Sequence, residues 1–283
     1  MNRSLIFSII LLTGILLQTS YAELFQWTDE NGVKHFSTEG APHQYKAEAS
    51  DEFNPDTTTH KFARFARIPA GRYIMGSPPG EKGRDSIREK QRHITIENDF
   101  FMMTTEVTRE MWERVMGHHF WGNRTCDKCP ATAQPLDSIL YFIKQLNLEE
   151  GAEIYRLPTE EEWEYACRAG SDRPFYTGNC LSFHQANIHP AFPPYGNCQF
   201  ESVKWVGAKR TGTYQANGWG LFDMYGNASE ICTTKDPAKK VKYVTRGGSF
   251  QDPPRKCRSA AFGTFNLNLP GNTVGFRLVK VIR

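Results

Sequence analysis

The sequence predicts an α+β domain with few helices, short strands and much irregular structure. Three observations support this prediction. Strand-like stretches lie between Phe65 and Glu106, and helical spacing of apolar residues follows between residues 108 and 169. After residue 170 the chain is rich in glycine, proline, asparagine and aromatic residues, and no long helical period continues there. With 283 residues, 39% of them hydrophobic, the chain can bury a core without a metal or disulfide and is too apolar for a disordered protein.

The first 22 residues have the three parts of a secretory signal peptide. Arg3 is a basic start, residues 5–17 are an apolar run, and Ser20-Tyr21-Ala22 is a small-x-small cleavage sequence. The apolar run is shorter than the roughly 20 residues needed to span a bilayer. We therefore expect residues 1–22 to be removed, leaving a periplasmic or secreted chain with no transmembrane segment. An uncleaved N-terminal anchor is the alternative.

Residues 23–45 are expected to form a short β-hairpin domain. Apolar and polar residues alternate on both sides of Asp29-Glu30-Asn31-Gly32, and Asn-Gly between such runs is the strongest local hairpin signal. The segment resembles a short tryptophan-containing hairpin domain found near the N-terminus of many bacterial envelope proteins. Residues 46–63 are polar and aperiodic, so we expect a linker, followed by one globular domain over residues 64–283.

The elements of the globular domain are predicted in chain order. They are strands over 65–75 and 93–106, helices over 108–116, 135–148 and 159–169, and strands over 243–250 and 274–281. Thr108 is the expected N-cap of the first helix, which Gly117 ends. Thr159 and Glu162 form a capping box that opens the third helix.

Four phrases occur in order along this domain, with weaker echoes before them at Met75-Gly-Ser77 and Glu106-Val-Thr108. They are RLPTEEEWEYACRAG at 156–170, GWGLFDMYGNA at 218–228, RGGSF at 246–250 and GFR at 275–277. Together they resemble the formylglycine-generating enzyme family, also called sulfatase-modifying factors, over roughly residues 64–283. The resemblance implies an α+β fold related to C-type lectins, often stabilised by calcium. Its best-known members use copper and oxygen to oxidise a sulfatase cysteine to formylglycine.

The resemblance places this chemistry directly after RGGSF. Family members have two cysteines there, because two thiolates can hold a monovalent copper ion. Cys257 matches the second cysteine and lies close to Ser249, but Asp252 occupies the position of the first. A carboxylate is a poor ligand for copper(I), and Ser229 replaces the tryptophan that usually follows Gly-Asn-Ala. We therefore predict a family member without cysteine-oxidising activity. A copper-dependent oxidoreductase acting through Cys257 and Ser249 is the alternative.

The resemblance also implies calcium. In relatives, the side chain at the Asp223 position and the carbonyl oxygens at the Met224, Gly226 and Ala228 positions surround one ion, a set of hard oxygens that suits calcium. A second calcium site in relatives uses an Ala-Asn-Ile phrase. Here Asn187-Ile188 match that phrase, although its acidic partner is not recognisable. A turn-forming aspartate is the alternative interpretation of Asp223.

The seven cysteines leave at least one sulfur without a partner in the chain. Many relatives carry cysteines at two positions that match residues 167 and 257, which favours a structural bridge between them. The Cys-x-x-Cys pair at 126 and 129 is expected to be a short-range disulfide, with redox chemistry or half a zinc site as alternatives. The expected pairs are Cys167–Cys257, Cys126–Cys129 and Cys180–Cys198, with Cys232 as a free thiol or an intermolecular bridge.

Composition and motifs limit the function further. The 34 basic and 31 acidic residues give a net charge of +3, which is no reason to expect nucleic acid as a partner. The sequence has no phosphate loop, no Gly-x-Ser-x-Gly elbow and no His-Glu-x-x-His. We expect a binding or accessory protein of the cell envelope, whose partner is an envelope protein or a surface ligand. The irregular segments 175–200 and 253–272 are its candidate binding surface. A purely structural accessory subunit is a further alternative.

Overall fold

The computed structural model describes strand residues 25–28, 34–37 and 57–59 and the ranges 63–117, 126–199, 204, 207–235, 241–265 and 271–282. The chain divides into two compact units, Met1–Pro55 and Asp56–Arg283. In the first unit, β1 (Phe25–Thr28) pairs antiparallel with β2 (Lys34–Ser37), one on each side of the predicted Asn-Gly turn. The expected signal peptide lies outside the described residues. Among the described helices, none has the length and apolar character needed to cross a membrane.

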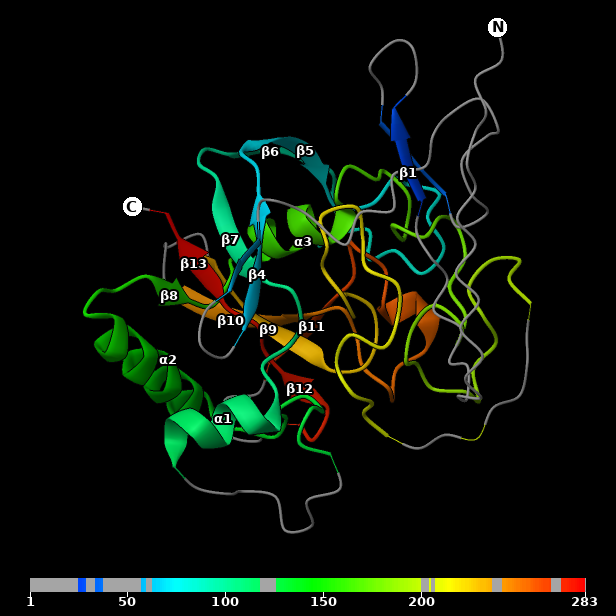
Figure 1. Cartoon of the computed structure of the whole chain (residues 1–283). Coiled ribbons are helices and arrows are strands. Elements are labelled where there is room, and N and C mark those ends of the chain that lie inside the picture. The colour runs from blue at the N-terminus through cyan, green and yellow to red at the C-terminus, as the bar shows by residue number, and fades with distance from the viewer. Residues whose placement is uncertain are drawn as a thin grey trace, which may run out of the picture. The chain divides into compact units, whose positions relative to one another are not determined.

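The second unit contains a five-stranded sheet in which every pair is antiparallel. Its order is β3 (Thr57–Thr59), β4 (Arg64–Ile68), β7 (Phe100–Met103), β13 (Val279–Val281) and β8 (Tyr155–Arg156). The last strand of the chain therefore lies between β7 and β8 (Figure 1). The sheet joins the beginning, middle and end of this unit.

Two smaller sheets lie in the described part of the second unit. One pairs β5 (Gly71–Met75) with β6 (Arg92–Ile96). The other has the order β11 (Phe262–Thr264), β10 (Val241–Arg246), β9 (Ser229–Lys235) and β12 (Val274–Gly275), with β12 parallel to β9. The strands predicted over 65–75 and 93–106 each divide between two sheets. The division of the first follows from Asp99, whose Oδ1 accepts the N–H of Ala70 at 2.7 Å and turns the chain between β4 and β5.

All three predicted helices are present. They are α1 (Arg109–Met116), α2 (Leu136–Glu150) and α3 (Glu160–Arg168). Thr108 caps α1, and the predicted capping box closes α3, because Thr159 accepts the N–H of Glu162 while the Glu162 side chain accepts the N–H of Thr159. α1 and α2 pack on each other, whereas α3 packs against β5, β9 and β10 (Figure 1).

Two apolar clusters form the core of this unit. Trp163 of α3 is fully buried in the first. In the second, Trp112 of α1 stacks on Phe142 of α2 with ring centroids 5.3 Å apart. Aromatic stacking of this kind adds to the gain from burial alone and fixes the two helices against each other.

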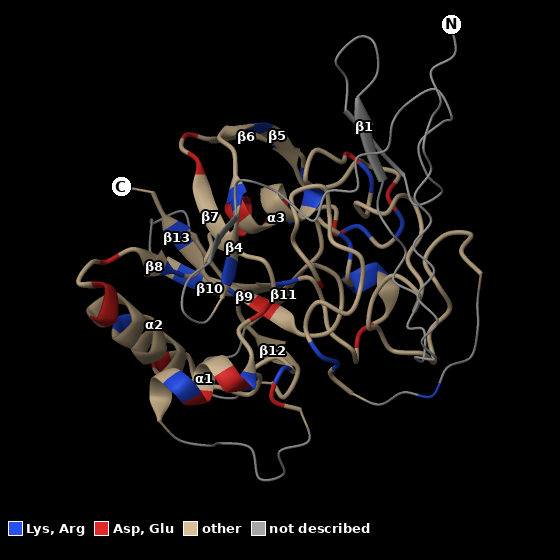
Figure 2. Ribbon diagram, viewed as in Figure 1, with Lys and Arg blue, Asp and Glu red and all other residues tan. Residues whose placement is uncertain are grey.

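Buried arginines hold the irregular parts of the chain together. Each lies in or beside one of the family phrases, is almost fully buried and bonds to a buried glutamate. The pairs are Arg168–Glu164, Arg246–Glu164, Arg258–Glu89 and Arg277–Glu230. Arginine suits this role because its planar fork of N–H groups can satisfy a carboxylate and several loop carbonyls at once. On α1, basic and acidic residues lie close together (Figure 2), and Arg114 pairs with Glu110.

Candidate functional site

The predicted catalytic position lies in the loop after β10, which includes the short 3-10 helix η1 (Pro254–Lys256). Asp252 closes this loop on itself. Its Oδ2 accepts hydrogen bonds from the N–H of Ser249 at 3.0 Å and from the Ser249 hydroxyl at 2.6 Å. The Asp252 carbonyl also accepts the N–H of His189 at 3.1 Å. These hydrogen bonds between Asp252 and Ser249 therefore stabilise the turn between the two residues.

Cys257 is fully buried beneath this loop. Its thiol faces the carbonyl of Pro253 at 3.9 Å, and burial, followed by the charge of Asp252, raises the pKa of the thiol well above its ordinary value. A Cβ atom placed on Gly248 would lie 2.6 Å from Cys257 Sγ, so the RGGSF backbone covers the sulfur closely. Copper(I) binding needs thiolates. A protonated, covered thiol beside a carboxylate that is engaged elsewhere does not fit a copper ion.

Two of the three expected disulfides are present. Cys126–Cys129 and Cys180–Cys198 are bonded, with Cα–Cα distances of 5.4 and 5.6 Å. The predicted Cys167–Cys257 disulfide is absent, and both sulfurs are buried free thiols, as is Cys232.

Cys167 and Cys257 do not form the predicted disulfide because their side chains point toward different partners. Cys167 Sγ donates to Ser259 Oγ at 3.7 Å, and that oxygen lies 2.9 Å from the Tyr225 hydroxyl. Cys257 points instead to the Pro253 carbonyl. Each thiol is thus held by its own polar partner, and burial raises the pKa of Cys167 to about 12.

The predicted calcium loop, 223–228, is tight and buried. Asp223 and Asn227 have left-handed φ angles of 54° and 55°, and a Cβ on Gly226 would lie 2.2 Å from the Asn187 carbonyl oxygen. Asp223 Oδ2 accepts the N–H of Gly212 at 2.5 Å. Asp223 Oδ1 is buried without a hydrogen-bond partner, and burial raises the pKa of this carboxyl to about 6. A buried carboxylate oxygen without a partner fits a cation ligand.

The other expected calcium ligands, Asn187 and Ile188, brace this loop. Asn187 Nδ2 donates to the Gly207 carbonyl at 2.9 Å and to Asn227 Oδ1 at 3.0 Å, while the Asn187 carbonyl accepts the N–H of Asn227 at 2.8 Å. Ile188 is a core residue. Across the described ranges, no three His, Cys, Asp or Glu side chains gather into a group that could hold a metal ion.

Sequence reasoning missed Glu106, which is fully buried beside this loop. Its Oε1 accepts a hydrogen bond from Asn227 Nδ2 at 2.9 Å, whereas its Oε2 has no partner. The hint in the sequence was the Glu106-Val-Thr108 phrase, which resembles the family. The role of Glu106 could not be predicted from this phrase, because its partner Asn227 lies 121 positions further along the chain.

A polar cleft of about 510 Å³ opens beside the C-terminal end of α3. Its lining includes Ser171, Tyr176, Thr177, His184, Gln185 and Gln215. The Tyr176 hydroxyl donates to the Gln215 carbonyl at 3.0 Å, and Thr177 Oγ1 is buried without a hydrogen-bond partner. The expected surface segment 175–200 thus contributes to the cleft. The described residues of 253–272 do not line it, and 168–171 and 215–218 take their place.

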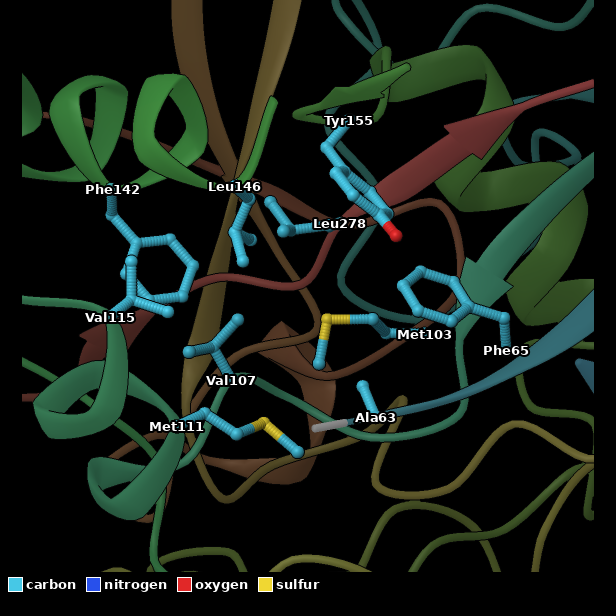
Figure 3. Close-up of a pocket in the computed structure, with 10 residues that line it drawn as sticks. All are labelled: Ala63, Phe65, Met103, Val107, Met111, Val115, Phe142, Leu146, Tyr155 and Leu278. Atoms are coloured by element: carbon cyan, nitrogen blue, oxygen red, sulfur yellow. The ribbon is translucent and has the colours of Figure 1, made fainter. Parts of the chain in front are cut away.

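A second, apolar pocket lies where α1 and α2 meet the five-stranded sheet (Figure 3). Val115 of α1, Phe142 and Leu146 of α2, and Phe65 and Tyr155 of the sheet point toward it. Its volume is about 20 Å³. That is about the space of one water molecule, so the pocket is a packing gap with no room for a ligand.

Comparison with known proteins identifies the relatives of this chain. The family described as the sulfatase-modifying factor enzyme 1-like domain matches residues 49–282. The formylglycine-generating enzyme of Mycobacterium tuberculosis is 34% identical over 152 residues, which cover 44% of this chain and 50% of that protein. A mouse protein named inactive C-alpha-formylglycine-generating enzyme 2 is 34% identical over 99 residues, covering 34% of this chain and 32% of that protein. The chain thus spans half or less of the length of these curated relatives.

The solved structures extend the likeness to the fold. Treponema denticola variable protein 1 superposes with a TM-score of 0.66 at 18% identity, over 81% of this chain and all of that one. At this identity the likeness concerns architecture, namely three helices, short strands in small sheets and long irregular segments.

Proposed function

The chain belongs to the sulfatase-modifying factor enzyme 1-like family, and from this premise we propose that it is an extracytoplasmic member that does not oxidise cysteine. We propose that it acts as a binding or accessory protein of the cell envelope. The two disulfides support an oxidising compartment, where such bonds persist. The mouse relative whose name calls it inactive shows that the family includes members described in this way.

The proposed absence of cysteine-oxidising activity is supported above all by the position of Asp252. In family members with the activity, a cysteine at this position and a second one bind copper together. Here the Asp252 carboxylate bonds to the Ser249 amide and hydroxyl, and the remaining thiol, Cys257, is buried with a raised pKa. Copper(I) requires soft thiolate ligands, and this loop offers a hard oxygen and a protonated sulfur.

The binding role is best supported by the polar cleft beside α3. Its lining combines hydroxyl, amide and imidazole groups with the ring of Tyr176. The nearby Arg168 bonds to Glu164 and so adds no net charge. A cleft of this composition suits an uncharged polar ligand that offers both donors and acceptors. The Cys180–Cys198 disulfide closes the chain segment that carries His184 and Gln185 and so limits the movement of this wall.

We further propose that the Asp223 loop binds calcium. The partnerless Asp223 Oδ1 would be one ligand, and the carbonyl oxygens of Met224, Gly226 and Ala228 would be others. Such an ion would stabilise the loop and would take no part in cysteine oxidation, since calcium is a hard cation bound through oxygen.

A titration of copper(I) into the full chain tests the loss of activity, together with counting of reactive thiols. We expect no stoichiometric tight copper binding, and we expect the three free thiols to react only after denaturation, because all three are buried. Cys257→Ser is the matched variant and should give the same copper titration as the unchanged chain. Tight uptake of one copper ion that Cys257→Ser abolishes would instead establish the copper-dependent oxidoreductase.

A further inference from the structure

Two basic segments that are far apart in the sequence come together in the fold. They are the loop between β5 and β6, residues 76–91, and the segment 251–258, which includes η1. Gly83 of the loop lies against Arg255, since a Cβ atom on Gly83 would be 3.1 Å from the Arg255 Cβ. Arg258 joins the two segments by donating to the Gly83 carbonyl at 2.6 Å. The basic residues of both segments therefore belong to one region of the surface.

Two acidic residues of the β5–β6 loop are directed into the domain. The side chains of Glu81 and Glu89 are only 3% and 4% exposed, and both bond to Arg258. The Ser77 hydroxyl also donates to Glu89, at 2.7 Å. These buried bonds brace the loop from within, so its outer side is left to other residues.

The outer side of these two segments is mostly basic. Residues 76–91 and 251–258 contain seven basic and four acidic residues, a net charge of +3 that equals the net charge of the whole chain. Besides the two buried glutamates, Asp252 is held by Ser249. The six basic residues that remain exposed or half-buried, here called the basic surface, are Lys82, Arg84, Arg88, Lys90, Arg255 and Lys256. Those of η1 are drawn in blue in Figure 2.

An isoleucine is exposed among these basic residues. Ile87 is 85% exposed, more than any other large hydrophobic residue in the described ranges. Asp85 Oδ1 fixes the turn that carries it by accepting the N–H groups of Ile87 and Arg88, both at 3.0 Å. The Arg88 guanidinium in turn lies 3.9 Å from the centre of the Phe262 ring. Burial of apolar side chains at the interface and attraction of basic residues to anionic headgroups are the two contributions that bind proteins to anionic lipid surfaces.

We propose that the basic surface docks the domain onto an anionic lipid membrane, with Ile87 entering the headgroup region and the lysine and arginine side chains contacting lipid phosphates. Lipid suits this surface better than a soluble polyanion, which would leave Ile87 in water. Because the bonds of Arg258 already fix the loop, docking orders few further groups. No residue of the basic surface lines the polar cleft. The inference therefore goes beyond the proposed binding role of the cleft and does not depend on it.

Co-sedimentation of the full chain with lipid vesicles tests this proposal. Vesicles of phosphatidylcholine with phosphatidylglycerol supply the anionic surface. Vesicles of phosphatidylcholine alone measure any binding through the apolar run at residues 5–17. We expect binding to the anionic vesicles to exceed this background and to weaken as the salt concentration rises, since salt screens exposed charges. Equal binding to the two kinds of vesicle would overturn the proposal.

The contribution of charge is tested by Lys82→Gln combined with Lys90→Gln. This double variant should weaken binding to anionic vesicles by about tenfold or more. The matched control combines Lys128→Gln with Lys144→Gln, which removes the same charge outside the basic surface and should leave binding nearly unchanged. All four lysines are exposed, so neither double variant should change the melting temperature. Equal weakening in both would assign the binding to net charge alone and overturn the role of the basic surface.

The contribution of the apolar side chain distinguishes a membrane from a soluble polyanion. Ile87→Ser should weaken vesicle binding by about tenfold and keep its dependence on salt. Leu148→Ser, at a position on α2 that is 61% exposed, is the control and should have no effect. Heparin serves as the soluble polyanion, and Ile87→Ser should leave heparin affinity unchanged. If Ile87→Ser also leaves vesicle binding unchanged, the surface attracts polyanions by charge alone, and a lipid membrane is overturned as its partner.

Discussion

Asp252 is held within its own loop by hydrogen bonds to a residue three positions before it. The sequence resemblance identified it as the position where a copper-binding cysteine is missing. The structure adds that its carboxylate bonds to the amide and hydroxyl of Ser249, so it stabilises the turn after RGGSF. Local spacing alone could have suggested this, because Ser249 and Asp252 are three residues apart, the distance of a capping interaction.

Other residues of the site could not be predicted because their partners are distant in sequence. Glu106 is held by Asn227, and Cys167 bonds to Ser259, which lies 92 positions away. The Cys167–Cys257 pairing was inferred from the co-occurrence of cysteines in relatives. The presence of cysteines at both positions in relatives suggests that the two residues lie in one region of the core. It does not determine the direction in which their side chains point.

The buried pair of Glu230 and Arg277 leads to a prediction about stability. Both side chains are fully buried, and Arg277 bonds to both Glu230 oxygens at 2.6 Å. Glu230→Gln removes the carboxylate charge that accepts two hydrogen bonds from the buried Arg277 guanidinium. We expect a loss of about 3–5 kcal/mol in the free energy of unfolding, measured by urea denaturation.

The exposed pair of Glu110 and Arg114 on α1 is the control for that experiment. Its side chains are 46% and 48% exposed and lie one helical turn apart. Glu110→Gln should cost no more than about 0.5 kcal/mol, because solvent screens such a pair. Equal losses for Glu110→Gln and Glu230→Gln would contradict the claim that buried arginines hold the domain together.

At the level of elements, local sequence predicted the three helices and the longer strands, whereas some of the shortest strands, which depend on pairing with distant segments, were not predicted. The capping residues Thr108 and Thr159 marked the starts of α1 and α3 correctly, because their hydrogen bonds reach only three residues along the chain. The short strands β8 and β11 were not predicted. β8 has two residues and pairs with β13, and β11 has three residues and pairs with β10; no local period reveals such pairing.

The loop between β5 and β6 gives a prediction about pH. Arg258 crosses to this loop and bonds to Glu81, to the Gly83 carbonyl and to both oxygens of Glu89. Burial alone would raise the pKa of Glu89, but the hydrogen bonds from Arg258 and Ser77 outweigh it and leave the pKa below its ordinary value of 4.5. The stabilisation from Glu89 is therefore complete above the pKa that this carboxyl has in the unfolded chain. It is lost as the pH falls through the lower pKa that Glu89 has in the folded chain.

Hydrogen exchange can follow this loss. Protection factors of amides in residues 77–89 should be constant near neutral pH and should fall below pH 4.5, where Glu89 takes up a proton. Glu89→Gln should lower protection at neutral pH and reduce the acid-dependent change, leaving the part that belongs to Asp85, whose pKa is also lowered by backbone hydrogen bonds from Arg88 and Ile87. An unchanged acid response in Glu89→Gln would assign the effect to Asp85.

For the molecule as a whole, the resemblance to the family predicted the fold. The periodicity of apolar residues predicted individual elements but not their arrangement. Local pattern identified three helices and an irregular C-terminal half, and the four ordered phrases supplied the architecture. The phrases are informative because each contains a buried arginine or a tight turn, such as Arg246, Arg277 and Gly226. In a domain with little regular structure, these side-chain bonds replace the hydrogen bonds that helices and sheets would supply.

Disulfides also stabilise the irregular segments, and the two disulfides close loops of different length. Cys180–Cys198 spans 18 positions and Cys126–Cys129 spans 3. By loop-closure entropy, the first should stabilise the domain by about 3 kcal/mol and the second by about 1.6 kcal/mol. For a domain of this size, 1 kcal/mol corresponds to about 2–4 °C in melting temperature.

Replacing Cys180 and Cys198 together with serine should therefore lower the melting temperature by roughly 6–12 °C, about twice the effect of replacing Cys126 and Cys129. The larger loop also carries His184 and Gln185 of the polar cleft, so its loss should release that wall and increase hydrogen exchange over residues 181–197. The Cys126–Cys129 variant is the matched control and should leave exchange there unchanged. Equal melting losses, with no change of exchange in the cleft, would show that side-chain bonds such as those of Arg168 hold this region without the disulfide.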